Sequence, residues 1–155
     1  MSLIVRPADI HEDAIIAEYF RLMWRDYDLE KKMVASWQNI VLEFIREARE
    51  KWQYRAFLAE LAGEVIGSAA CQRFQGLYPN VFDLEKRNYG YIWGVYIVPE
   101  QRGKGAAKLL TTACTDYLKE SGCTRAILHA APMGRPVYEK LGFKTGNEMY
   151  LDLVS

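Results

Sequence analysis

The chain has 155 residues, of which 50% are hydrophobic and 26% are charged, the composition of an ordinary globular protein. Its 20 basic residues balance its 20 acidic residues, so no overall basic field favours nucleic acid or an anionic membrane. The length fits one domain over residues 1–155. Three unpaired cysteines, two distant histidines and the lack of an N-terminal apolar run predict a cytoplasmic protein without disulfide framework, metal site or membrane span.

The first half of the sequence predicts a strand, two helices and a hairpin. A short strand at 3–6 ends at Pro7, and Asp9 with Glu12 three residues later predicts a capping box for a helix to about Trp24. A second helix is predicted at about 31–51. Its apolar residues follow the i, i+3, i+4 pattern: Trp37, Ile40, Val41, Phe44, Ile45 and Ala48. Strands at 54–61 and 65–73 flank the hairpin turn Ala62-Gly63-Glu64.

The second half predicts alternating strands and helices. A strand at 89–98 is followed by a helix at about 105–121, a strand at 125–130, a short helix starting near Pro136 and a last strand at about 147–153. The order is therefore β-α-α-β-β-β-α-β-α-β. The hairpin indicates antiparallel pairing, and the strand–helix–strand unit indicates a parallel pair. We therefore predict an α/β (α+β) fold with a mixed, mostly antiparallel central sheet and helices on both faces.

The segment 91–110 is the strongest candidate for a functional site. A strand, a turn of small residues and a helix N-terminus follow one another, which predicts free backbone N–H groups that can bind phosphate. The string G-x-x-x-x-G-K-[ST] does not occur, and the G-x-G-x-x-G pattern that begins at Gly103 and Gly105 fails at Lys108. Two common nucleotide motifs are therefore excluded.

A different motif does match here. The residues Arg102-x-x-Gly105-x-Ala107, after Ile97-x-Pro99-Glu100, resemble the acetyl-CoA signature Q/R-x-x-G-x-G/A of the GNAT superfamily of N-acetyltransferases. The segment 137–143 resembles the late "LYEKLGF" motif of the same family. The resemblance spans nearly the whole chain, and it implies the GNAT fold.

The resemblance implies acetyl-CoA as co-substrate and a set of residues that contact it. Small side chains at Gly105 and Ala107 would let phosphate approach the backbone. Backbone groups of Ile97 and Val98 would hold the pantetheine, with the Ile97 N–H facing the oxyanion, and Tyr138 would contact the cofactor and donate a proton to the leaving thiolate. The backbone amides implied for the pyrophosphate are those of Arg102, Gly103, Lys104, Gly105, Ala106 and Ala107. The family's usual Asn near Ala131 is absent, so no side-chain contact to pantetheine is expected there.

The acceptor end is less defined, because the strand at 91–98 contains no carboxylate that could act as base. His129, at the end of a strand that would line the cleft, is a candidate base because imidazoles titrate near neutral pH. Asp83 and Glu85 in the preceding loop, or a tyrosine acting through water, are alternatives. Candidate substrate contacts are Trp24, Tyr78, Asp83 and Trp93, whose aromatic members fit either a cage for a cationic amine or plain core packing.

The function implied is an N-acetyltransferase that moves an acetyl group from acetyl-CoA to a primary amine by direct attack in a ternary complex. A small-molecule amine is the favoured acceptor, and a peptide amine acted on by a protein N-acetyltransferase is an alternative. The other alternative is a non-catalytic CoA-binding or sensor domain that keeps the fold. Because GNAT-like domains often dimerise, a homodimer is also compatible with the resemblance. No nucleic-acid partner is expected, because the sequence has no basic or stacking motif.

Overall fold

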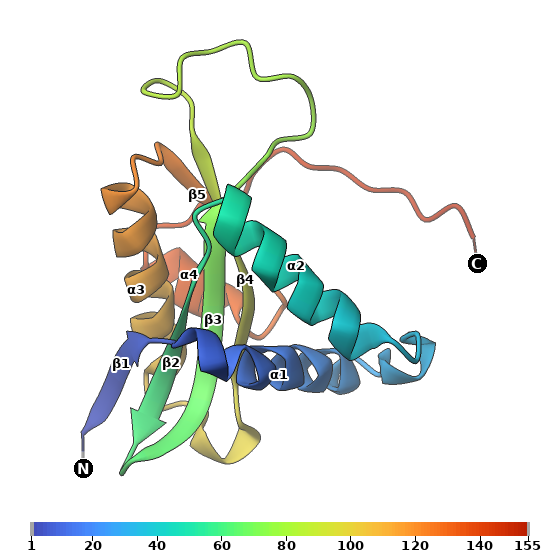
Figure 1. Cartoon of the computed structure of the whole chain (residues 1–155), viewed down its shortest axis with the longest axis vertical. Helices are drawn as coiled ribbons and strands as arrows, with labels where there is room; N and C mark the ends of the chain where they lie inside the picture. The colour runs from blue at the N-terminus through green and yellow to red at the C-terminus, as the bar shows by residue number, and fades with distance from the viewer. Residues whose placement is uncertain (1, 155) are drawn as a thin grey trace.

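A five-stranded mixed sheet forms the centre of the computed structural model, which describes residues 2–154 (Figure 1). The strands lie in the order of the sequence: β1 (Leu3–Pro7), β2 (Arg55–Leu61), β3 (Glu64–Arg73), β4 (Tyr89–Ile97) and β5 (Arg125–Ile127). The first three pairings are antiparallel, and β4 pairs with β5 in parallel. The predicted fold class is confirmed.

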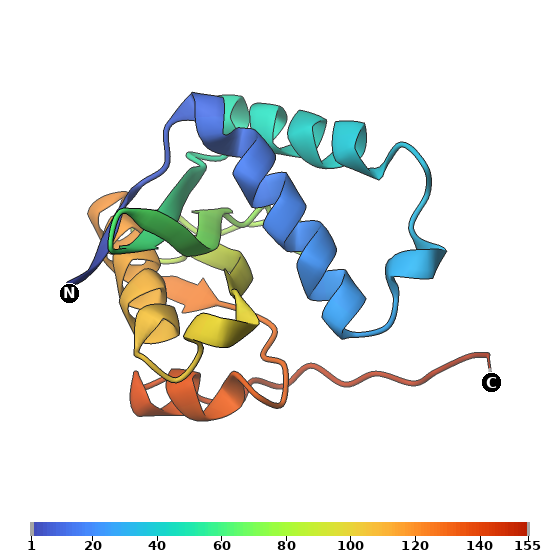
Figure 2. The ribbon, with the colours of Figure 1, turned by 90° about the horizontal axis from the view of Figure 1, so that it is seen from below.

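Helices cover both faces of this sheet (Figure 2). One face carries α1 (Asp13–Asp26) and α2 (Trp37–Lys51), and the other carries α3 (Ala106–Glu120), with the short α4 (Arg135–Lys140) beside it. Single 3-10 turns at Ile10–Glu12, Glu30–Lys32 and Pro99–Gln101 complete the described elements. None of the helices in residues 2–154 combines the length and the apolar composition that crossing a membrane requires.

The predicted capping box forms at the 3-10 turn Ile10–Glu12, which leads directly into α1. The Asp9 carboxylate accepts the His11 N–H at 2.9 Å, and the Glu12 carboxylate accepts the Asp9 N–H at 2.8 Å. Arg6 of β1 binds Glu12 at 2.8 Å and also Glu60 of β2. The Arg6 guanidinium, helped by the Asp9 N–H, lowers the pKa of Glu12 to about 2. The capping box therefore joins the first helix to the edge of the sheet.

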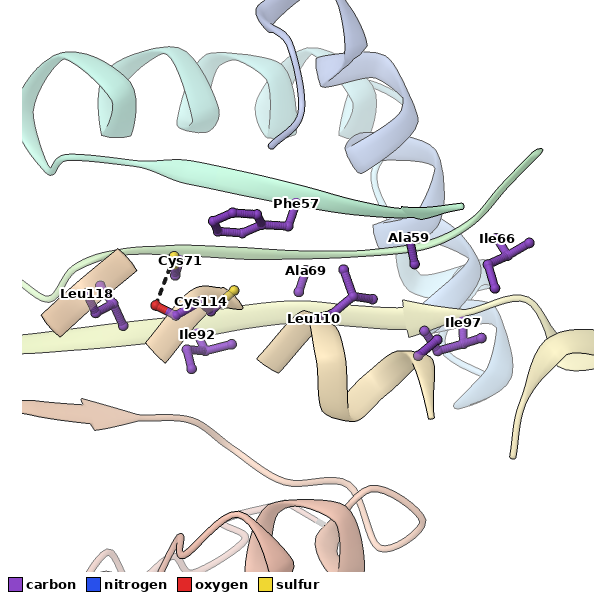
Figure 3. Packing of buried hydrophobic residues seen from close by; sticks show 11 residues of the cluster. Phe57, Ala59, Ile66, Ala69, Cys71, Ile92, Ile97, Leu110, Cys114 and Leu118 are labelled. Atoms are coloured by element: carbon purple, nitrogen blue, oxygen red, sulfur yellow. Dashed lines mark hydrogen bonds between the residues drawn. The ribbon is translucent and has the colours of Figure 1, made fainter. Parts of the chain in front are cut away.

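Alternate side chains of β2 point to opposite faces of the sheet and pack into two separate hydrophobic cores. Ala56 and Leu58 pack against α1 and α2, whereas Phe57 and Ala59 face α3. Both sets are buried because a helix covers each face of the sheet. Figure 3 shows the α3 side, where the helix presents Leu110, Cys114 and Leu118 to the strands. This packing holds the N-terminus of α3 in a fixed position relative to the end of β4.

The side chain of Leu118 on α3 packs directly over Gly90 of β4. A Cβ added to Gly90 would lie 2.6 Å from a methyl of Leu118, so a larger residue there would force the Leu118 side chain to shift.

The predicted last strand, at 147–153, is wrong. After Phe143, which still packs against Tyr138, the chain follows an extended path with no strand partner to its described end (Figures 1 and 2). A strand needs a neighbour to satisfy its backbone groups, and β5, predicted at 125–130, has only three paired residues. The second helix was also predicted too long, because the segment before Trp37 contains a 3-10 turn instead.

Candidate active site

The turn between β4 and α3 presents backbone N–H groups to solvent. Gly105 is the N-cap of α3, with a φ of 90° and no side-chain cap. The Leu109 N–H donates to the Gly105 carbonyl, so the N–H groups that precede it have no acceptor inside the helix. A Cβ on Gly105 or Gly103 would meet nothing within 4 Å. Residues Arg102–Ala107 are called the α3 turn below. They lie at the positive end of a helix dipole, a position where backbone N–H groups can bind an anion.

The side chain of Arg102 points back into the protein. Its Nε donates to the Ile97 carbonyl at 2.8 Å, and its Nη2 donates to Asp26 at the end of α1 at 2.9 Å. Its guanidinium also lies over the Tyr96 ring, 5.3 Å from the centroid. Arg102 therefore positions the α3 turn, and the candidate anion site itself consists of backbone N–H groups.

The second half of β4 has an unpaired edge beside the α3 turn. β5 pairs only with Tyr89–Tyr91, so β4 continues to Ile97 without a neighbour on that side. The Val98 N–H donates to the Ile66 carbonyl at 2.9 Å. Because alternate residues of an antiparallel pair face opposite neighbours, the Ile97 N–H faces the unpaired edge. The Val98 carbonyl accepts the Gln101 N–H at 2.9 Å, so both backbone groups of Val98 are engaged.

A β-bulge lies within this edge. The register between β3 and β4 shifts between Ser68 and Ala70, so one extra residue of β4 opposes β3. Gly94 has a φ of 66°, a conformation that favours glycine. The bulge turns the strand at the point where its pairing with β5 has ended.

A cleft of about 680 Å³ opens on the α1–α2 side of β4. Its walls come from α1, α2, residues 91–95 of β4, residues 128–131 after β5, and Tyr138 of α4. Most of the lining is apolar or aromatic: Phe20, Met23, Trp24, Tyr27, Ile40, Val41, Phe44, Tyr91, Ile92, Trp93, Val95 and Leu128. This region is called the aromatic cleft below.

Tyr138 lies at the inner end of the aromatic cleft. Its ring packs edge-on against Phe143, with centroids 5.9 Å apart, and only 9% of the residue is exposed. Tyr138 also lines a second, larger cavity of about 1710 Å³ beside β5. Burial, with smaller effects of Tyr27 and Cys114, raises the pKa of Tyr138 to about 12. Its hydroxyl therefore remains a proton donor at neutral pH.

Tyr91, His129 and Glu148 form a hydrogen-bonded chain that begins in the aromatic cleft. The Tyr91 hydroxyl lies 2.7 Å from His129 Nδ1, and His129 Nε2 lies 2.6 Å from Glu148 Oε2. A carboxylate has no proton to donate, so Nε2 carries the hydrogen and Nδ1 accepts one from Tyr91. Burial and the Glu148 charge raise the pKa of Tyr91, which keeps the phenol protonated. The arrangement resembles a catalytic triad with a phenol in the first place.

A family model matches most of the chain. The model of the acetyltransferase (GNAT) family matches residues 16–143, which include most of α1, all of α2, the α3 turn and Tyr138. The chain belongs to the acetyltransferase (GNAT) family. It is therefore an acyltransferase enzyme, and the predicted family is confirmed.

Similar proteins agree with this assignment. The chain is 32% identical over 100 residues to a glucosamine 6-phosphate N-acetyltransferase of Trypanosoma brucei brucei, covering 64% of this chain and 65% of that relative. A predicted acetyltransferase of Clostridium acetobutylicum, solved with acetyl-CoA, has a TM-score of 0.80 at 24% identity, and the match covers 99% of this chain and 96% of that chain. A GCN5-related N-acetyltransferase of Ralstonia eutropha has a TM-score of 0.78 at 22% identity, covering 98% and 99%. At these identities the two structures establish the fold alone.

The acetyltransferase places four predicted residues around one cleft. Trp24, Trp93, His129 and Tyr138 all line the aromatic cleft. The α3 turn and Ile97 lie at the end of the same strand, as expected.

Two predicted substrate contacts lie elsewhere. Tyr78 is in the exposed loop between β3 and β4, lines the larger cavity, and accepts a hydrogen bond from Arg87 at 3.1 Å. Asp83, in the same loop, lines neither cavity. Its backbone carbonyl instead accepts the N–H groups of Lys86 and Arg87. The loop thus brings Tyr78 to the larger cavity, which Tyr138 also lines, but it brings neither side chain to the aromatic cleft.

Several site residues were missed at the sequence level. Glu148 was assigned to a terminal strand, and nothing in its local pattern indicates a contact with His129 nineteen residues earlier. Phe44 was assigned to the apolar face of the second helix without a site role, and Phe20 was not singled out. For Phe44, the available sequence signal was its place in the apolar i, i+3, i+4 pattern of α2. Within residues 2–154, no three His, Cys, Asp or Glu side chains gather in a way that could hold a metal ion.

Proposed function

We propose that the protein is an N-acetyltransferase that transfers an acetyl group from acetyl-CoA to a primary amine of a small molecule, by direct attack in a ternary complex. One observation carries the proposal: the aromatic cleft is lined both by a protonated phenol, Tyr138, and by the Tyr91–His129 pair. A donor for a leaving group and an acceptor for an amine proton therefore face the same space. The cytoplasmic location and the pairing of two copies stay predictions.

The α3 turn fits the pyrophosphate of acetyl-CoA. Backbone N–H groups from Gly103 to Ala107 supply the donors, because the Arg102 N–H already donates to the Pro99 carbonyl at 3.3 Å. The open space in front of Gly103 and Gly105 lets phosphate oxygens approach the backbone. The lysine ammonium at position 104 lies next to the turn, 2.7 Å from the Gln101 side-chain oxygen. Bound acetyl-CoA would supply the thioester that the amine attacks.

The unpaired edge of β4 would hold the rest of the co-substrate. The N–H of Ile97 is directed to this edge and is the candidate donor to the oxyanion. A backbone donor suits this role because it is already oriented by the strand and needs no reorganisation during the reaction. Val98 would contact the co-substrate through van der Waals packing and not through hydrogen bonds, because its N–H and carbonyl already have partners.

Tyr91, His129 and Glu148 would remove the amine proton. The Tyr91 oxygen accepts the proton from the amine while its own proton passes to His129 Nδ1 over the 2.7 Å hydrogen bond. The imidazolium that results is stabilised by the Glu148 carboxylate at 2.6 Å. His129 is thus the proton acceptor, Tyr91 is the contact to the amine, and Glu148 is a positioning residue.

Tyr138 would assist the leaving thiolate. Its raised pKa, about 12, lies above that of an ordinary thiol near 8.5. Donating a hydrogen bond to the developing thiolate is therefore more favourable than complete proton transfer in the ground state. The hydroxyl can do this without losing another partner, since none of the side-chain hydrogen bonds among residues 2–154 involves it.

The proposal is tested by thiol release from acetyl-CoA over a panel of primary amines. Wild-type protein should release CoA only in the presence of an accepted amine, and Tyr138→Phe should slow turnover by about 10- to 100-fold while acetyl-CoA still binds in calorimetry. Acetyl-CoA binding without release on any amine would instead indicate a sensor domain. Wild-type turnover in Tyr138→Phe would remove Tyr138 from the mechanism.

A further inference from the structure

The residues that line the aromatic cleft indicate what kind of group the acceptor carries besides its amine. Among the described residues that line it, only His129 belongs to the Asp, Glu, Lys, Arg and His types. A phosphate or a second ammonium placed here would lose water without gaining a partner of opposite charge, which is costly. The cleft is therefore poorly suited to a sugar phosphate and to a polyamine.

The walls of the cleft are fixed and apolar. Phe20 and Phe44 stand edge-on to Trp93, each with ring centroids 5.5 Å from it and an interplanar angle of 88°. The indole N–H of Trp93 donates to the Gln72 side-chain oxygen at 3.0 Å. Trp93 thus offers the cleft an aromatic surface, because its polar group is already bound elsewhere.

Several apolar side chains at the rim remain exposed. Val41 and Ile45 of α2 are buried in the core, but Ile40 and Phe44 on the same helix are 55% and 50% exposed. Tyr27, at the end of α1, is 44% exposed. All three exposed residues line the cleft. Large apolar groups left in water around a cavity indicate a surface that an apolar ligand covers.

We propose that the acceptor is a primary amine on a neutral aromatic or branched aliphatic body, with the body in the aromatic cleft and the amine at Tyr91. This inference rests on the proposed acetyltransferase function and specifies its substrate class. The volume of about 680 Å³ lies within the range of small-molecule sites, so the cleft can hold a body of one or two rings. The amine then lies between the hydrogen-bonded Tyr91–His129 pair and Tyr138.

The first experiment compares kcat/KM of the wild-type protein for four amines. These are 2-phenylethylamine, ethanolamine, spermidine and glucosamine 6-phosphate, each assayed by CoA release. We expect 2-phenylethylamine to exceed ethanolamine by at least about 100-fold, since burial of the ring is available only to the former. We expect spermidine and glucosamine 6-phosphate to be the poorest substrates.

A variant pair tests whether the cleft causes this preference. Phe44→Asp places a carboxylate at the rim, and we expect the KM for 2-phenylethylamine to rise at least about tenfold while use of spermidine improves. Ile10→Asp is the matched control, because Ile10 is 57% exposed and does not line the cleft. Thermal unfolding of both variants should remain close to wild type, which excludes misfolding as the cause.

The outcomes separate this inference from the function on which it rests. Release with none of the four amines would overturn both. Release with spermidine or glucosamine 6-phosphate at a kcat/KM equal to that with 2-phenylethylamine would overturn the substrate class and leave the acetyltransferase function intact. An unchanged KM in Phe44→Asp would also overturn the assignment of the apolar body to this cleft.

Discussion

The α3 turn and the aromatic cleft meet along β4 but are built in different ways. The turn is one continuous stretch, Arg102–Ala107, whose donors are backbone N–H groups. The cleft takes side chains from α1, α2, β4, the segment after β5 and α4. Backbone donors recognise a group common to many ligands, whereas assembled side chains recognise the particular shape and charge of one. We infer that the chain keeps its family's co-substrate in the first region and its own acceptor in the second.

The largest expected effect comes from blocking the α3 turn. Gly105→Val adds a branched side chain where phosphate would lie, so acetyl-CoA affinity should fall by at least about 100-fold, as expected for the loss of two charge-assisted hydrogen bonds. Calorimetry measures this directly. Gly63→Val is the matched control, because Gly63 also has a positive φ and open space but lies in the β2–β3 turn.

Both glycine variants share a backbone strain of about 1–2 kcal/mol, so both should lose stability. Only Gly105→Val should lose affinity. Equal affinity losses in the two variants would mean that strain, and not the position of the turn, explains the effect.

The next variants change residues at the aromatic cleft and leave the α3 turn unchanged. His129→Gln should lower kcat/KM by about 10²- to 10⁴-fold, because the proton acceptor is removed. Glu148→Gln should cost about tenfold, or 1.4 kcal/mol, because only the stabilising charge is lost. Acetyl-CoA affinity should be unchanged in both variants.

The control for Glu148 is Asp152→Asn, another exposed carboxyl of the same C-terminal segment. It should leave the rates at the wild-type value. Equal rates for Glu148→Gln and Asp152→Asn would show that Glu148 takes no part in the reaction.

A third expected effect concerns stability at high pH. The pKa of Tyr138 is raised to about 12 in the folded protein, against about 10 when unfolded. Between these values the folded state keeps a proton that the unfolded state has lost, so Tyr138 makes stability fall as pH rises from about 10 to 12, by about 2–3 kcal/mol in total. Denaturant unfolding should show a shallower alkaline loss for Tyr138→Phe than for the wild type.

Tyr78→Phe is a suitable reference for this measurement, since Tyr78 is 64% exposed. Its curve should run parallel to that of the wild type. Parallel curves for Tyr138→Phe as well would contradict the burial of its hydroxyl.

The smallest effect is expected at the ion pair that joins the two regions. Asp26, beside the cleft residue Tyr27, binds Arg102 of the α3 turn at 2.9 Å. Both side chains are about one third exposed, so a double-mutant cycle with Asp26→Asn and Arg102→Gln should give a coupling below about 1 kcal/mol. A coupling of several kcal/mol in unfolding would show that the turn and the cleft behave as one unit.

Prediction from sequence succeeded where an interaction is local. The capping box at Asp9, the turn at Gly105 and the Tyr138 motif each depend on a few consecutive residues, and each lies where it was expected. It failed for the last strand, because a strand depends on a partner that the local pattern does not contain. It did not specify the path of the exposed β3–β4 loop, which depends on contacts such as that between Tyr78 and Arg87, so the substrate contacts at Tyr78 and Asp83 stay predictions.

The sequence by itself determined the family, the mixed fold and the glycine-containing turn before α3, because short-range backbone geometry and contiguous motifs specify them. Only the tertiary structure revealed the aromatic cleft and the hydrogen-bonded chain beside it. The chain Tyr91–His129–Glu148 joins three distant segments, and the aromatic cleft joins five. The apolar residues of α2 illustrate the reason. Ile45 and Phe44 both belong to the same apolar pattern, but Ile45 is buried in the core and Phe44 is half exposed at the rim of the cleft. The periodic pattern predicts which side chains lie on the apolar face of the helix. Only the tertiary packing determines whether protein atoms cover such a side chain or leave it open to a ligand.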